Sequence, residues 1–560
     1  MYLDAVAPAS SAGKRGRFSF GLKLFLAVSL LFVADRLFYG VGAGSTAGLF
    51  AGLLIAAAAL ARPAIRRSVA ASIAAGAALL FAVALFADPS LLAAALFWAA
   101  VSMMVLLPRI GFDNGLRWAV RVGYQLVAAA ALPFRDFGKV QRARRRRARS
   151  RTHSRIALFG LPFMGSLVFL ALFARANPLI GEALSVEWSE AAAGLSFARL
   201  GFWLLSAVAI WSLLRPALLR LGRIDLVEED FALPGVSLAS VTLSLIAFNL
   251  IFALQNALDV AFLWSGAPLP GDLTLADYAH RGAYPLIATA LLAALFVLVT
   301  LRPGTEMAES RLVRRLVSVW IAQNVLLVAS TMLRTIDYVE AYSLTILRIS
   351  ALLWMALVAI GLMLICWRLW GRKSARWLIN ANLLAAGLLL SACAFVDLGA
   401  VAASWNVRHA REAGGKGAAL DLCYLGQLGD SALLPVIELE SRIKEPAFRG
   451  KLAWIRNTRL LALEARQRDW RTWTMLGARR LEAARTAASA HRLPRFAPDA
   501  RGCDAAPAPL PPPPVVAQPA PPLPSAGVER TGTPAGVEPI GTPTPAERDA
   551  RTTLTAPAAR

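Results

Sequence analysis

Long apolar blocks separated by short polar loops dominate the pattern of this chain. Eleven such blocks recur along it, at residues 22–41, 45–61, 69–87, 90–108, 156–175, 197–214, 237–263, 283–301, 315–333, 344–369 and 376–400. Each is close to the roughly 20 residues that an α-helix needs to cross a hydrocarbon core of about 30 Å. The pattern therefore predicts an all-α fold, a polytopic transmembrane bundle of about eleven helices.

Basic residues collect in alternate loops between these blocks. They follow the second, fourth, sixth, eighth and tenth blocks, and more lie before the first, whereas the opposite loops carry acidic residues such as Asp88, Glu187 and Asp277. Because short cytoplasmic loops are enriched in Lys and Arg, this alternation predicts a cytoplasmic N-terminus and a periplasmic C-terminus. The first block has no clear cleavage site, so we interpret it as a retained helix.

Two stretches of the N-terminal half carry further patterns. Residues 112–135 are amphipathic and basic, and we interpret them as a helix on the cytoplasmic surface. If they spanned the membrane instead, every later loop would invert. Glycines recur every fourth residue at Gly40, Gly44, Gly48 and Gly52, a spacing that predicts one helix face suited to close helix approach.

The order of these patterns predicts six regions along the chain. They are a basic cytoplasmic N-terminus at 1–21, membrane helices with a surface helix at 22–135, an Arg-rich cytoplasmic loop at 136–155, the main transmembrane bundle at 156–400, a helical periplasmic segment at 401–492 and a disordered Pro-rich tail at 493–560. Within the periplasmic segment we expect one long helix from Trp454 to about Ala488. The tail composition cannot bury a core.

Composition and charge agree with a membrane protein. Hydrophobic residues make up 57% of the chain and charged residues 17%, against about a quarter charged in a soluble domain. The net charge of +24 comes from 59 Lys and Arg against 35 Asp and Glu. Since most of these cations lie in short loops, we expect the lipid bilayer as partner, with anionic lipid at the Arg-rich loop, and no nucleic acid.

The residues that usually hold metals or carry catalysis are sparse. His153, His280, His409 and His491 are far apart and lack metal-ligand spacing, so we predict no metal, no cofactor and no catalytic constellation. Cys366 and Cys393 lie in apolar blocks and read as packing residues. A disulfide between Cys423 and Cys503 is permitted if the C-terminal region is periplasmic.

Polar side chains that are costly to hold in a membrane gather toward the predicted outer face, and such residues are functional candidates. The candidate site comprises Asp259, Tyr278, His280, Arg281, Arg334, Asp337, Tyr338, Tyr342, Arg348, Asp397, Trp405 and Asn406. If the helices are neighbours, the three arginines of this set could face its three aspartates around an outward-opening pocket. The alternative is that these residues are interfacial anchors and structural ion pairs that stabilise helix ends.

Several strings in the C-terminal half resemble a known bacterial family. They are LTLADYAHRGAYPL at 273–286, RTIDYVEAYSLTILRISALLWM at 334–355, Trp405-Asn406, LDLCYLGQLGDSALLP at 420–435 and DWRTWTM at 469–475. Together they resemble a polytopic membrane family catalogued as a domain of unknown function, four-one-seven-three, with its sister family four-one-five-three. The resemblance covers roughly 230–480. Ser343 stands where that family's pattern has a glycine, and His280 where a second basic residue is usual. The resemblance implies a helical membrane fold and no established activity.

Three functions fit these patterns in a bacterial inner membrane. The first is a non-enzymatic envelope component, a sensor, scaffold or assembly partner that uses the periplasmic segment and the tail to contact envelope proteins. The second is a transporter or flippase with an outward-facing polar pocket. The third is an enzyme acting on a lipid-linked substrate at the periplasmic face. The missing catalytic constellation favours the first, so we lean away from an enzyme.

Overall fold

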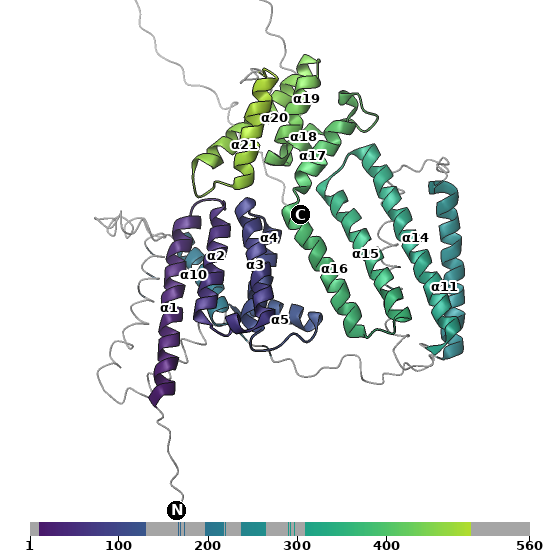
Figure 1. Cartoon of the computed structure of the whole chain (residues 1–560). Coiled ribbons are helices and arrows are strands. Elements are labelled where there is room, and N and C mark those ends of the chain that lie inside the picture. The colour runs from purple at the N-terminus through teal and green to yellow at the C-terminus, as the bar shows by residue number, and fades with distance from the viewer. Residues whose placement is uncertain are drawn as a thin grey trace, which may run out of the picture. The chain divides into compact units, whose positions relative to one another are not determined.

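The structure is a computed structural model that describes part of the 560-residue chain (Figure 1). It describes residues 10–129, 197–217, 219, 237–264 and 309–493, together with isolated positions at 166, 169, 173, 289, 292 and 296. Every regular element in these residues is a helix, which confirms the predicted all-α fold.

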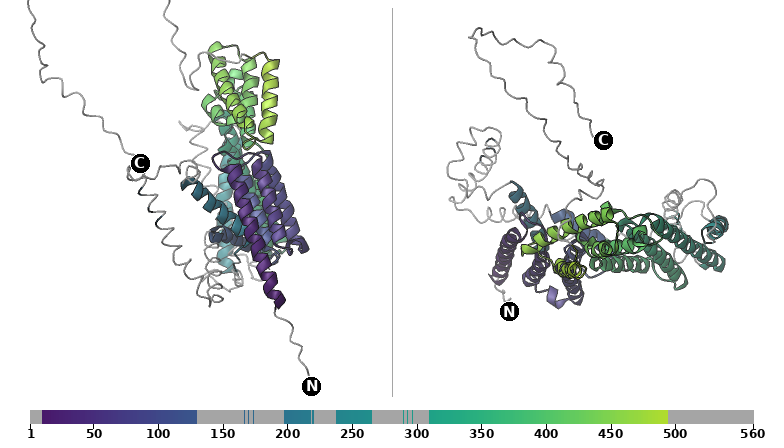
Figure 2. Two further views of the ribbon diagram at one scale, coloured as in Figure 1. Left: turned by 90° about the vertical axis from the view of Figure 1, so that its left-hand side faces the viewer. Right: turned by 90° about the horizontal axis from the view of Figure 1, so that it is seen from above.

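The first set of helices, here the N-terminal group, comprises α1 (Ser10–Phe38), α2 (Thr46–Ala61), α3 (Val69–Ala87), α4 (Leu91–Leu106), α5 (Gly115–Ala129) and α10 (Phe197–Leu214). Helix α3 packs between α2 and α4, and α1 packs against α10 (Figures 1 and 2). Buried alanines such as Ala58, Ala71, Ala78 and Ala93 line these contacts. Small side chains let the helix backbones approach closely, as is common between membrane helices.

A second set, the C-terminal group, comprises α11 (Leu238–Asp259), α14 (Arg311–Tyr342), α15 (Ile346–Trp370) and α16 (Ala375–Phe395). A single π-turn, Val260–Trp264, continues α11. Trp320 of α14 is the centre of the core, with Phe248, Phe252 and Phe296 at ring-centroid distances of 5.2–5.7 Å. Edge and stacked contacts of this kind stabilise a core beyond the area that they bury.

The helices α17 (Leu398–His409), α18 (Leu422–Gln427), α19 (Leu433–Arg442), α20 (Pro446–Arg468) and α21 (Met475–Ala490) form what we call the helical cap. Leu425, Val436, Leu439 and Leu452 are completely buried in its core. Cys423 is disulfide-bonded, whereas Cys366 and Cys393 are free. Cys503, the partner that the sequence suggests for Cys423, lies outside the described residues.

Side-chain caps explain where most of the helices begin. A hydroxyl or carboxylate oxygen at each N-cap accepts a hydrogen bond from a backbone N–H three residues on, at Ser68, Ser90, Ser237, Ser310, Thr345, Ser374, Asp397, Asp421 and Thr474. The short polar loops of the sequence therefore also carry the signals that start the next helix.

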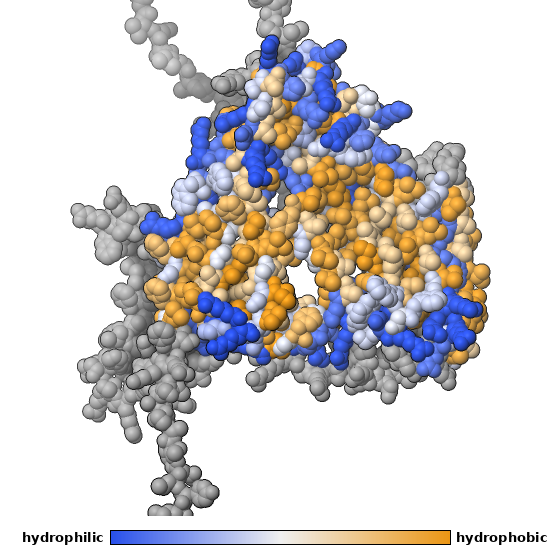
Figure 3. Space-filling view, viewed as in Figure 1, coloured by the Kyte–Doolittle hydropathy of each residue, from blue (hydrophilic) through white to orange (hydrophobic). Residues whose placement is uncertain are grey.

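Five described helices are long and apolar enough to cross a membrane. They are Val69–Ala87, Leu238–Asp259, Arg311–Tyr342, Ile346–Trp370 and Ala375–Phe395, and three apolar helices are shorter. Large apolar side chains such as Val83, Leu250 and Leu384 are exposed on the sides of these helices, and hydrophobic residues cover the middle of the helices in the space-filling view (Figure 3). These features are compatible with a membrane protein, since lipid can cover such surfaces.

Nine of the eleven predicted blocks coincide with described helices, namely α1–α4, α10, α11 and α14–α16. The blocks at 156–175 and 283–301 lie outside the described residues apart from isolated positions. The stretch 112–135 contains α5, which packs against α4, α10 and α16 and buries Trp118, Arg121 and Gln125.

Two local predictions are wrong. The helix expected from Trp454 to Ala488 is two helices, α20 and α21, because the chain turns at 469–474 and Thr474 caps a new helix. Gly40 and Gly44 precede α2 rather than lying on its face.

An ion pair that no sequence pattern indicates joins α1 to α10. Arg199 of α10 donates from Nε to Asp35 Oδ1 at 2.9 Å.

Candidate functional site

An ion pair between Asp259 and Arg334 joins α11 to α14. Asp259 is 1% exposed and Arg334 is 6% exposed, so both charges are buried. Gln255, one turn earlier on α11, donates from Nε2 to Asp259 Oδ1 at 3.0 Å. A buried charge requires a partner because isolated ions are costly to desolvate. Two of the twelve predicted site residues thus meet directly.

Amides extend this contact along the two helices. Gln323 Nε2 donates to Asn249 Oδ1 at 3.2 Å, and Asn256 Nδ2 donates to the Gln323 carbonyl at 3.2 Å. Asn249 Nδ2 donates to the Leu316 carbonyl at 3.1 Å. We call Asn249, Gln255, Asn256, Asp259, Gln323, Asn324 and Arg334 the polar seam. It runs between α11 and α14 where apolar residues would be expected in a membrane helix pair.

The polar seam has unused acceptors. Four buried oxygens lack a hydrogen-bond partner within the described part of the chain, namely Asn256 Oδ1, Asp259 Oδ2, Gln323 Oε1 and Asn324 Oδ1. Buried polar atoms nearly always have a partner, protein or water. The oxygens therefore favour a donor that the described residues do not supply, such as water or a solute with N–H or O–H groups.

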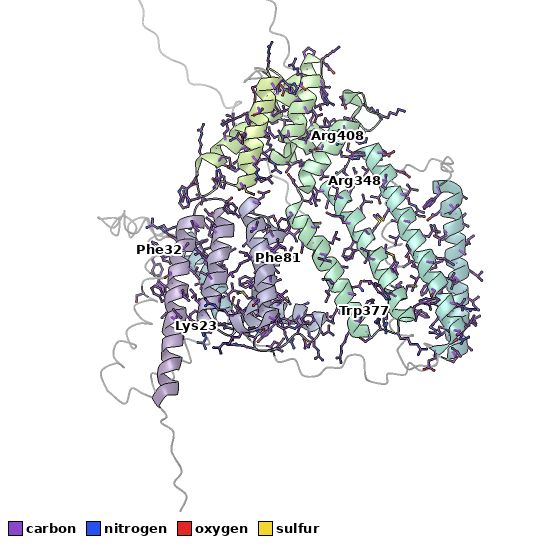
Figure 4. The ribbon with its side chains drawn as sticks, in the orientation of Figure 1. Lys23, Phe32, Phe81, Arg348, Trp377 and Arg408 are labelled. Carbon is purple, nitrogen blue, oxygen red and sulfur yellow. The ribbon has the colours of Figure 1, made fainter. Side chains whose placement is uncertain are left out.

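The turn between α14 and α15 holds a second part of the predicted set. The Arg348 guanidinium lies 4.3 Å from the centre of the Tyr338 ring, and Tyr338 and Tyr342 are 4.8 Å apart between ring centroids. Arg348 also donates to the carbonyl of Tyr342 at 2.6 Å and to that of Ser343. These contacts tie Arg348, which is labelled near the start of α15 in Figure 4, to its own turn. The local geometry therefore matches an anchor of the helix end.

Residues of the helical cap form hydrogen bonds with the turn between α14 and α15. Asn406 accepts from Leu344 N at 2.6 Å and donates to the Leu344 carbonyl at 2.9 Å. Tyr424 Oη accepts from Ile346 N at 2.8 Å. The side-chain amide of Asn406 thus bonds both the N–H and the carbonyl of Leu344, as a residue on a neighbouring strand does in a β-sheet. These bonds satisfy the backbone groups of Leu344, a buried residue between two helices.

Asp397 has a different environment from the one suggested by the sequence. Its carboxylate caps α17 by accepting from Ala400 N at 3.0 Å, accepts from Ser431 Oγ at 3.0 Å and pairs with Arg480 of α21. The structure therefore joins Asp397 to the helical cap and pairs it with neither Arg334 nor Arg348, the two arginines of the predicted set that lie within the described residues. Asp397, Ser431 and Arg480 form a second cap contact.

The remaining predicted residues are dispersed. Trp405 stacks on His409 with ring centroids 4.1 Å apart, and Asp337 is half-buried on α14. Tyr278, His280 and Arg281 lie outside the described residues. The part of the set that is described thus divides into the polar seam, the α14–α15 turn and the cap contacts.

The structure also shows a third cap contact, between the turn at 469–474 and the start of α2, which is absent from the sequence-based predictions. Ser45 N donates to the Trp473 carbonyl at 2.7 Å, Ser45 Oγ accepts from Met475 N at 3.2 Å, and Thr46 Oγ1 donates to the Arg471 carbonyl at 3.1 Å. Phe86 and Trp473 pack edge to face beside them. The only signal in the sequence is Thr474, a capping residue inside an expected helix.

Gly44 permits this third contact. A Cβ atom at Gly44 would lie 2.3 Å from the Arg471 carbonyl oxygen and 2.7 Å from both Thr472 C and Trp473 O. All three are backbone atoms, so no side-chain rotation relieves the overlap. The approach of the two chain segments therefore depends on a residue without a side chain.

The helical cap also contains a buried ion pair of its own. Arg456 Nε lies 2.9 Å from Glu440 Oε2, and both side chains are almost completely buried. Burial raises the pKa of Glu440, although the charges of Arg456 and Arg449 oppose this shift. The pair links α19 to α20 and makes the cap a packed unit. Within the described residues no cluster of His, Cys, Asp and Glu suits a metal ion.

The comparisons with known proteins identify a family for this chain. The sequence model of the domain of unknown function DUF4153 matches residues 49–439, so the match includes the N-terminal half that the sequence resemblance did not cover. No curated protein and no solved structure matches the chain. The family is the one named as the sister in the resemblance. Since the match covers well over half of the chain, this protein belongs to the DUF4153 family.

Proposed function

We propose that the protein is a multi-pass inner-membrane component of a bacterial envelope, with a cytoplasmic N-terminus and a periplasmic C-terminus. In this proposal it acts as a non-enzymatic platform, on which the helical cap and the Pro-rich tail receive other envelope proteins. The Arg-rich loop at 136–155 lies against anionic lipid on the other side. The side assignment rests on the alternation of basic and acidic loops.

One observation carries the platform function, the fixation of the helical cap at three places. Asn406 holds the α14–α15 turn, Arg480 pairs with Asp397 after α16, and Trp473 bonds Ser45 before α2. Anchors on both helix groups would keep the cap in one orientation, and a preorganised surface loses less entropy when a partner binds. A flexible tether would not need this arrangement.

The disulfide at Cys423 supports the side assigned to the cap, because disulfides persist in the periplasm and are rare in the cytosol. The test uses Cys503→Ser and a membrane-impermeant maleimide added to spheroplasts. We expect Cys423 to be labelled in the variant and protected in the wild type. Labelling only after lysis would refute the periplasmic assignment.

Photo-crosslinking tests the platform. A photoreactive amino acid at Trp470 or Leu461, both well exposed on the cap, is expected to give a discrete crosslink to an envelope protein. Gly44→Ala, which disturbs the cap contact, should weaken this crosslink, whereas Gly42→Ala, where a Cβ meets only Thr472 Cγ2 at 4.0 Å, should not. Crosslinks to lipid or to the chain itself alone, or crosslinks insensitive to Gly44→Ala, would contradict the platform function.

A transporter with a polar pocket is the second candidate, and the unused acceptors of the polar seam favour it. Buried polar groups between membrane helices commonly mark solute or ion paths. Thiol labelling distinguishes the transporter from the platform. It uses Asn256→Cys and Gln323→Cys in a chain in which Cys366 and Cys393 are replaced by Ala. Labelling from both sides of the membrane would support transport, and labelling from neither side would count against it.

A further inference from the structure

Helix α5 has its polar side buried and its apolar side exposed. Arg121 and Gln125 are buried, together with Trp118. Every exposed residue of α5 is apolar or glycine, and we call this set the apolar stripe: Leu116, Ala119, Val120, Gly123, Leu126 and Val127. These residues recur at intervals of three and four, so they lie along one side of the helix. A helix at a water surface shows the reverse arrangement.

The polar side of α5 has its partners within the protein. Arg121 donates from Nη1 and Nη2 to the two carboxylate oxygens of Asp113 at 2.7 and 2.8 Å. Arg117 Nη1 lies 3.6 Å from the same carboxylate. At the other end of the helix, Gln125 Nε2 donates to the Ser212 carbonyl of α10 at 3.1 Å. The charged and amide groups of α5 are therefore directed into the protein rather than toward water.

A contact with α16 fixes the depth at which α5 begins. Gly115 N donates to Asn380 Oδ1 at 2.8 Å, and a Cβ atom at Gly115 would lie 2.6 Å from Leu383 Cδ1. Helix α16 begins at Ala375 and is one of the five described helices that are long and apolar enough to cross a membrane. At 1.5 Å per residue, Asn380 and Leu383 lie roughly 8 and 12 Å inside its end. The start of α5 thus lies beyond the first turn of a candidate membrane span.

The apolar stripe continues a surface that suits lipid. Helix α5 packs against α4 and α16 and runs crosswise at the lower end of α4 (Figure 1). On α16, Leu384 and Leu388 are each 63% exposed, and on α5 Leu126 and Val127 are 61% and 76% exposed. A stripe without charged or hydrogen-bonding side chains gains nothing from water or from headgroups, whereas acyl chains cover it without cost.

We propose that α5 lies within one leaflet of the membrane, where phospholipid acyl chains cover its apolar stripe. The polar side contacts the protein and the apolar side contacts lipid. A helix resting on the cytoplasmic surface, which the sequence predicts, would instead turn its polar side to water. The amphipathic pattern of this stretch thus has a different cause, because the protein takes the place of water. The inference rests on the proposed membrane location and is independent of which leaflet is involved.

Spin labels report the medium around each position of the full-length protein in phospholipid vesicles. Single cysteines replace Val120 or Val127 of the apolar stripe, in a chain without its two free cysteines. Leu384→Cys on α16 is the reference for lipid, and Ala483→Cys, exposed on α21 of the helical cap, is the reference for water. Each label is tested for collisions with oxygen, which concentrates among acyl chains, and with a water-soluble nickel chelate.

We expect the ratio of oxygen to chelate collisions in the apolar stripe to match that at Leu384→Cys. It should exceed the ratio at Ala483→Cys roughly tenfold or more, since polar solutes are excluded from hydrocarbon. A ratio as low as that at Ala483→Cys would place the stripe in water and overturn the proposal. Low collision rates with both reagents would mean that protein covers the stripe, which would also overturn it. Chelate access at Leu384→Cys would refute the membrane location and the proposal together.

Discussion

Replacing Gly44 by Ala should release the helical cap from the start of α2. The added Cβ would lie within 2.7 Å of three backbone atoms of residues 471–473, a separation that Cβ atoms do not tolerate, so the turn must move away. Three hydrogen bonds across this contact would then be lost. They run from Ser45 N to the Trp473 carbonyl, from Thr46 Oγ1 to the Arg471 carbonyl and from Met475 N to Ser45 Oγ. At about 1 kcal/mol each, the docked state loses about 3 kcal/mol, or roughly 100-fold in its equilibrium constant.

Hydrogen exchange followed by mass spectrometry measures this loss directly. The amides of Ser45 and Met475 donate across the contact, and we expect them to exchange roughly 100-fold faster in Gly44→Ala. Gly42→Ala is the matched control, because a Cβ there approaches nothing closer than Thr472 Cγ2 at 4.0 Å. Protection in Gly44→Ala equal to that of the wild type, or equal loosening in Gly42→Ala, would refute the reasoning.

Three further substitutions test other parts of the structure. Ser343 has φ 71° and ψ 162°, a region essentially restricted to glycine, so Ser343→Gly should raise the free energy of unfolding by about 1 kcal/mol, and an unchanged Tm would contradict this. Arg334→Met should lower the free energy of unfolding by about 3–5 kcal/mol because it leaves Asp259 without its cationic partner. Adding Asp259→Asn should recover part of this loss, and a double variant no more stable than Arg334→Met would argue against the ion pair. Since the folded-state pKa of Glu440 is raised above its ordinary value of 4.5, its contribution to stability is present below that value and lost as pH rises through the raised pKa. The Tm of the wild type relative to Glu440→Gln should therefore fall as the pH rises above the ordinary pKa of 4.5, and a pH-independent difference would count against the shift.

The helices were predictable from the sequence because each depends on a local pattern. A membrane helix needs about 20 apolar residues and a cap, and both lie within one short stretch, as in α15 with Thr345 before Ile346. The family's glycine at the position of Ser343 has the same local cause, a backbone conformation with positive φ. Patterns of this kind are complete within a few turns of helix.

The partners of the charged residues were not predictable, because they depend on tertiary contacts. Asp35 pairs with Arg199 and Asp397 with Arg480, residues that are 164 and 83 positions apart. Arg36 is adjacent to Asp35 in the sequence, yet successive residues on a helix point in different directions and do not face each other. The polar seam was predictable only in part. The sequence identifies its amide and charged residues, whereas the packing of α11 on α14 decides which of them face each other.

The bond between Ser45 and Met475 spans 430 positions, and this separation has a consequence for biogenesis. At 5–20 residues per second, a ribosome needs roughly 20–90 s to make the distance from one to the other. During that interval the start of α2 already exists while its partner is not yet synthesised. The contact can therefore close only late in the maturation of the protein, after the chain has been made as far as the start of α21.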